Sequence, residues 1–72
     1  MTKRIILRHP EGVSTIESDD LTLLEVFYKW ILSTNRFSDY SENNDEKTFI
    51  FARRTFVSVC NVKWHRICES SK

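Results

Sequence analysis

Three side chains near the end of the chain could bind a metal ion, because Cys60, His65 and Cys68 fall within nine residues. A structural zinc site usually takes four such ligands, often as two closely spaced pairs. A second pair is missing here, since the only other histidine is His9, far back in the chain. On an extended strand, His65 also points to the opposite face from both cysteines. The sequence therefore predicts no metal site and no cofactor.

The same cysteines and histidine are the best candidates for a catalytic nucleophile and its base. Such a pair needs an orienting group and a stabiliser for the developing oxyanion. No glycine-rich turn flanks either cysteine, since Gly12 is the only glycine. Two acid pairs, Asp19-Asp20 and Asp45-Glu46, are explained by helix capping and by loop solvation. We therefore predict no catalytic residue, no enzymatic activity and no small-molecule substrate.

Basic and aromatic residues give a stronger signal, because charge is segregated along the chain. Residues 47–68 hold five basic residues and no acid, residues 1–9 carry a charge of +3, and residues 10–46 carry −7. Basic grooves with aromatic side chains bind single-stranded nucleic acid, and complementary charged patches guide protein association. The residues that we expect to contact a partner all lie in the acid-free segment: Phe49, Phe51, Arg53, Arg54, Lys63, Trp64 and Arg66.

A β-hairpin and a helix are predicted to position the first half of the chain. The segments Arg4–Arg8 and Val13–Glu17 have strand composition, and His9-Pro10-Glu11-Gly12 between them suits a type I turn, with proline second and glycine fourth. A helix is expected over Leu21–Thr34, because Ser18-Asp19-Asp20 offers N-cap residues. Its apolar side chains recur at helical spacing: Leu23, Leu24, Phe27, Trp30 and Ile31.

The second half is predicted as a loop followed by two strands. Residues 36–46 are polar and acidic without periodicity, which indicates a loop. The segments Lys47–Ala52 and Thr55–Ile67 are rich in β-branched and aromatic residues, as strands are. Two points stay open: the joint at Arg53-Arg54 fits a longer hairpin or a bulge, and the residues beyond Trp64 also fit a short terminal helix.

Together these elements predict an α+β fold class. We expect one domain over residues 1–72, with the order ββαββ and an antiparallel sheet packed on one amphipathic helix. The strand Thr55–Ile67 then has apolar residues on both faces, although one helix covers only one. Three explanations compete: the sheet curls around its own core, the second face is buried in a dimer or against a protein, or exposed rings stack on nucleic-acid bases.

The leading functional hypothesis is a small non-enzymatic intracellular binding protein. It would be a regulator, adaptor or inhibitor that acts through protein–protein contacts, as a homodimer. The alternative is a nucleic-acid-binding module with a basic, aromatic sheet surface. Both cysteines are expected to be free thiols, and no apolar run approaches the roughly 20 residues of a membrane span. We therefore expect a cytoplasmic protein without membrane contact.

Overall fold

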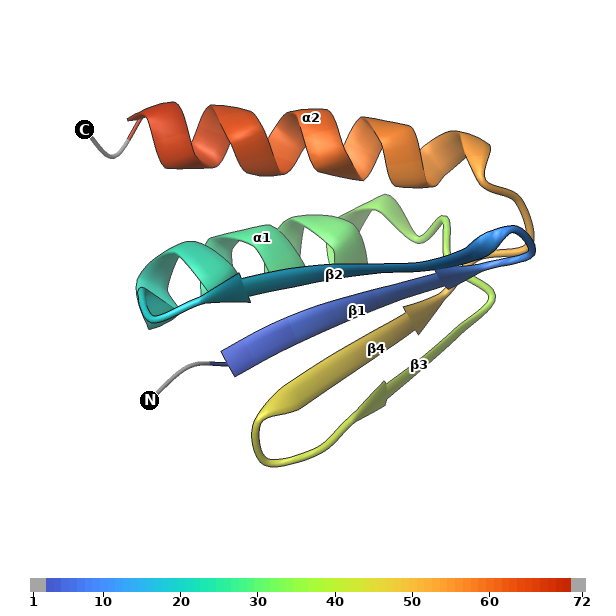
Figure 1. Cartoon of the computed structure of the whole chain (residues 1–72), viewed down its shortest axis with the longest axis horizontal. Helices are drawn as coiled ribbons and strands as arrows, with labels where there is room; N and C mark the ends of the chain where they lie inside the picture. Colours follow the sequence, from blue (N-terminus) through green and yellow to red (C-terminus); the bar gives the residue numbers. More distant parts are fainter. Residues whose placement is uncertain (1–2, 71–72) are drawn as a thin grey trace.

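The computed structural model describes residues 3–70 and has the order ββαββα. A four-stranded sheet with the strand order β2-β1-β4-β3 packs with the first helix, and the second helix lies along the first (Figure 1). The α+β class is confirmed. The elements are β1 (Lys3–His9), β2 (Gly12–Ser18), α1 (Leu21–Thr34), β3 (Asp39–Glu42), β4 (Glu46–Ile50) and α2 (Thr55–Ser70).

The predicted hairpin and first helix are confirmed. β1 and β2 pair antiparallel from His9↔Gly12 outward, and Gly12 has a φ of 147°, a backbone conformation that favours glycine. Asp20 is the N-cap of α1, because its Oδ1 accepts hydrogen bonds from the N–H groups of Thr22 and Leu23 at 3.1 and 3.2 Å. Asn35 closes the helix in the left-handed conformation, with a φ of 54°.

The prediction of a purely antiparallel sheet is wrong, because β1 and β4 run parallel. The two hairpins, β1–β2 and β3–β4, are each antiparallel. Helix α1 runs back along the sheet, so β3 starts at the same end as β2, and β4 then runs in the direction of β1 (Figure 1). A parallel neighbour needs such a long crossover connection, and no local sequence signal marks it.

The prediction of a loop over residues 36–46 is also wrong in part. That segment contains the short strand β3, which pairs with β4, and β4 already begins at Glu46. Only one side chain of β3 faces the core: Tyr40 packs against Phe49, with ring centroids 4.8 Å apart. The other β3 residues are exposed and polar, so the strand has the composition of a loop.

The prediction of a strand over Thr55–Ile67 is wrong, because these residues form most of helix α2. Most of the apolar residues that would fall on both faces of a strand fall on one side of a helix: Val57 and Cys60 are buried, and Trp64 and Ile67 pack against the core. Val59 and Val62 stay exposed. Helix α2 packs mainly against α1, and α1 is the helix that packs against the sheet, as predicted. Arg53-Arg54 is neither a hairpin turn nor a bulge, since it links β4 to α2.

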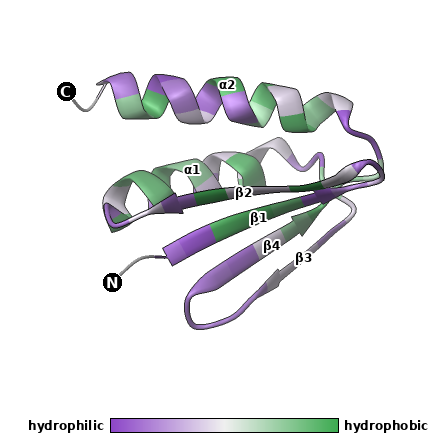
Figure 2. Cartoon of the chain, viewed as in Figure 1, coloured by the Kyte–Doolittle hydropathy of each residue, from purple (hydrophilic) through white to green (hydrophobic). Residues whose placement is uncertain are grey.

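The core lies between the helices and one face of the sheet. Hydrophobic stretches in β1, the end of β4 and both helices face it, whereas β3 and the start of β4 are hydrophilic (Figure 2). The buried side chains are Ile5, Leu7, Ile16, Leu24, Phe27, Ile31, Phe49, Phe51, Val57 and Cys60. Within residues 3–70, no helix combines the length and the apolar character of a membrane span.

Candidate functional site

The residues predicted to contact a partner do not form one surface. Phe49 is 0% exposed and Phe51 is 2% exposed, so both rings belong to the core. Arg53 and Arg54 are exposed in the link before α2. A partner that binds this fold without opening it reaches the arginines and not these phenylalanines.

The three predicted residues on α2 also point in different directions. Trp64 is half-buried against Phe27, with ring centroids 5.3 Å apart, whereas Arg66 is exposed. The Lys63 ammonium lies 5.5 Å from the centroid of Trp30 on α1. Lys63 and Trp64 thus join the two helices, and Arg66 alone is presented to solvent.

Cations cover the aromatic rings that hold the helices together. Trp30 and Phe56 stack 5.7 Å apart across the α1–α2 interface. Lys63 lies over Trp30, and the Arg36 guanidinium lies 5.7 Å from the centroid of Phe56. Such cation–π contacts stabilise the interface. They also occupy the ring faces on which a nucleic-acid base would stack.

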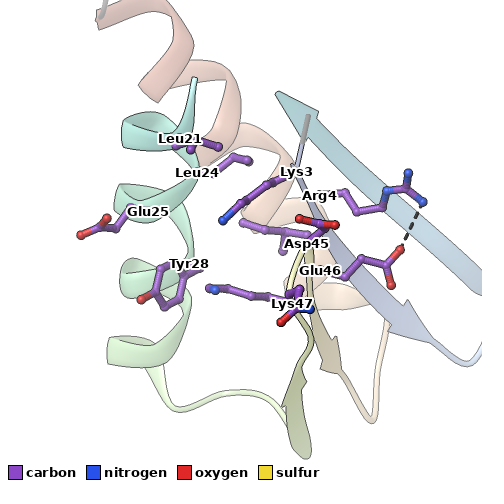
Figure 3. A pocket seen from close by; sticks show the side chains of 11 residues that line it. Lys3, Arg4, Leu21, Leu24, Glu25, Tyr28, Asp45, Glu46 and Lys47 are labelled. Carbon is purple, nitrogen blue, oxygen red and sulfur yellow. Dashed lines mark hydrogen bonds and ion pairs between the residues drawn. The ribbon is translucent and has the colours of Figure 1, made fainter. Parts of the chain in front are cut away.

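A small hollow opens where α1 begins beside the first residues of β1 and β4 (Figure 3). Its volume is about 210 Å³, below the roughly 300–1,000 Å³ of most small-molecule sites. The Lys47 ammonium lies 4.5 Å from the centroid of Tyr28 and donates to the Glu42 Oε2 atom at 3.1 Å. Cations and anions line the hollow in equal number: Lys3, Arg4, Lys47, Glu25, Asp45 and Glu46. This balance favours no ligand of either charge.

Cys60, His65 and Cys68 do not line this hollow. Cys60 is fully buried, and burial raises the pKa of its thiol to about 12, so it is protonated at neutral pH. Cys68 is half-buried, and neither thiol is in a disulfide. Across residues 3–70, no group of three or more Cys, His, Asp or Glu side chains could hold a metal ion.

The main chain of β2 offers a different kind of site. The Arg4 N–H donates to the Asp45 carbonyl at 3.1 Å, and the Arg8 carbonyl accepts from the Phe51 N–H at 2.8 Å. These bonds turn the main-chain groups of Arg4 and Arg8 toward β4, and main-chain groups alternate sides along a strand. Ile6 has the same phase and also bonds to β4, so Ile5 and Leu7 are the residues between them that bond to β2.

The outer edge of β2 follows from this alternation. Leu7 and Ile5 pair with Ser14 and Ile16, which are thus the β2 residues that bond to β1. The N–H and C=O groups of Val13, Thr15 and Glu17 consequently point away from the sheet. No other segment of residues 3–70 donates to or accepts from these groups. We call them the β2 edge.

The two edges of the sheet differ. β3 has only four residues, including Asp39 and Glu42, and its outward Tyr40 N–H donates to the Asp39 Oδ1 atom at 2.8 Å. Short length, charge and a capped N–H protect an edge from pairing. β2 has seven residues without proline, lysine, arginine or a bulge. It is a long template for another strand.

Side chains beside the β2 edge carry opposite charges at its two ends. At one end, Arg8 lies beside Val13, and Arg54 lines a shallow hollow with Val13 and Ser14. At the other end are three acids, Glu17, Asp19 and Asp20, and β1 places Lys3 and Arg4 opposite Ser18 and Glu17. Glu17 forms an ion pair with Arg4, in which the Arg4 Nε and Glu17 Oε1 atoms are 3.6 Å apart. We call these the basic end and the acidic end of the β2 edge.

Comparisons of the chain with protein-family models, with curated proteins and with solved structures found no match. Any proposal about function therefore depends on the geometry of the chain itself. Sequence reasoning missed the β2 edge, because a strand order cannot be read from one sequence. The available signal was the composition of Gly12–Ser18, which has no proline or lysine and only one charged residue, Glu17.

Proposed function

We propose that the chain is a small non-enzymatic binding protein that acts through protein–protein contacts, as a regulator, adaptor or inhibitor. The β2 edge carries this proposal, because open N–H and C=O groups on a seven-residue strand accept a further strand. Strand addition gives affinity through main-chain bonds and specificity through alternate side chains. Neither Cys60 nor Cys68 is in a disulfide, which supports a cytoplasmic location.

The substitution Thr15→Pro tests this function. Proline removes the outward Thr15 N–H and is tolerated where that group faces solvent, so the bonds between β1 and β2 are kept. The wild-type chain, used as bait in a nuclease-treated cell extract, should retain proteins that the Thr15→Pro bait loses. Ser41→Lys on β3 is the matched control, since it changes the other edge, and it should retain them. Equal capture by all three baits would contradict docking on β2.

A second candidate function is nucleic-acid binding. Exposed arginines support it, because Arg8, Arg53 and Arg54 all lie near the ends of β1 and β4. A labelled single-stranded DNA oligonucleotide is the probe. If this function holds, affinity falls steeply with salt and is lost in the double variant Arg53→Ala/Arg54→Ala. Absent or salt-insensitive binding removes it.

A further inference from the structure

We infer that the β2 edge pairs with the β2 edge of a second copy of the chain, in an antiparallel arrangement centred on Thr15. This inference rests on the proposed function and names its partner. Thr15 is the middle residue of the seven in β2, so a two-fold axis at Thr15 keeps the whole strand in register. The joined sheet would run continuously through both copies.

The register satisfies the open main-chain groups. Pairing at Thr15 sets Thr15 opposite Thr15 of the second copy and Val13 opposite its Glu17. Because these residues all point their N–H and C=O groups outward, each forms a hydrogen-bonded pair with its counterpart. A Thr–Thr pair across two strands is itself favourable. β3 offers no equivalent, since its Tyr40 N–H is already bonded to Asp39.

Charge complementarity selects the antiparallel arrangement and a second copy as the occupant. Antiparallel pairing brings the acidic end of one β2 edge against the basic end of the other. Glu17 of the second copy then lies in the same cross-strand row as Val13 and Arg8. Among the described residues, no carboxylate lies within ion-pair distance of Arg8. One surface thus supplies both halves of the interface, as a two-fold dimer requires.

α2 lies on the β2 side of the molecule (Figure 1). A two-fold axis perpendicular to the sheet places α2 of both copies on the same side of the joined sheet. Val59 and Val62 are 47% and 54% exposed on α2, so this side of the joined sheet carries exposed apolar side chains.

Sedimentation equilibrium and a cysteine register test decide the inference. The wild-type chain and Ser41→Lys should sediment at twice 8.6 kDa, whereas Thr15→Pro should sediment as a monomer at the same concentration. In a Cys68→Ser background, Thr15→Cys should form a covalent dimer on mild oxidation. The Cα atoms of a hydrogen-bonded pair are about 5.5 Å apart, within the disulfide range. Cys60 stays unreactive, because it is buried.

Neighbouring positions test the register. Val13→Cys should not cross-link to itself, because the two copies of residue 13 are offset by about 13 Å along the strands. It should cross-link when mixed with Glu17→Cys. A monomeric wild-type chain, or a Thr15→Cys chain that does not cross-link, overturns the second copy as occupant. The proposed function still stands if Thr15→Pro then loses captured proteins, and both fail if the chain is monomeric and capture is unchanged.

Discussion

At the scale of single residues, the chemistry-bearing side chains have structural roles. Cys60 is fully buried between α2 and the rest of the core, and Asp20 caps α1 through its carboxylate. Both residue types were candidates for catalysis or metal binding in the sequence. In the folded chain, Cys60 contacts core side chains and Asp20 accepts hydrogen bonds from helix N–H groups. These contacts give both residues a structural role.

Cys60 gives a prediction about reactivity and pH. Burial raises the pKa of its thiol from the usual 9.0 to about 12. Alkylation with iodoacetamide at pH 8, followed by mass analysis, should therefore modify Cys68 well before Cys60. The unfolded thiol ionises near pH 9 and the folded one only near 12. Cys60 should thus contribute fully to the free energy of unfolding below pH 9, and this contribution should be lost as the pH rises from about 9 to about 12. Rapid modification of Cys60 in the folded chain would contradict its burial.

At the scale of elements, local chemistry predicted some segments and misled about others. The first hairpin and α1 were predictable, because a Pro-x-Gly turn and an N-cap acid act within a few residues. Helix α2 was not, because its run of Thr, Phe and Val has strand composition. Packing of Val57 and Cys60 against the core overrides that preference. β3 and the parallel β1–β4 pair depend on distant residues, so no local pattern marks them.

The substitution Val59→Ala distinguishes a helix from a strand in α2. Val59 is 47% exposed, so its replacement leaves no cavity. Alanine is the better helix former by up to about 0.7 kcal/mol, and the free energy of unfolding should rise by a few tenths of a kcal/mol or more. In a strand the same change would lower it. Urea denaturation provides the measurement, and the buried control Val57→Ala should cost about 2 kcal/mol.

The β3–β4 hairpin gives a prediction about pH. Lys47 donates a hydrogen bond to Glu42 across the two strands, and this ammonium holds the pKa of Glu42 below its usual 4.5. Protonating Glu42 therefore weakens the hairpin, so its contribution is present above pH 4.5 and is lost as pH falls through the lowered pKa. An NMR titration should show Glu42 returning toward 4.5 in Lys47→Gln. An unchanged Glu42 titration in that variant would rule out the pairing.

At the scale of the whole molecule, the segregation of charge along the sequence is partly cancelled by folding. Arg4 from the basic start pairs with Glu17 and Glu46 from the acidic middle. The folded chain still has a basic end and an acidic end along the β2 edge. The sequence predicted a dimer from an apolar two-faced strand that does not exist. The self-association that we propose depends on a different feature, the open β2 edge.

Amide hydrogen exchange at Thr15 tests this pairing most directly. The Thr15 N–H points away from β1, whereas the Ser14 and Ile16 N–H groups bond to β1 in either state. At high protein concentration the Thr15 amide should be protected, and dilution should release it while Ser14 and Ile16 stay protected. A Thr15 amide that exchanges as fast as an unstructured one at every concentration would contradict pairing through β2.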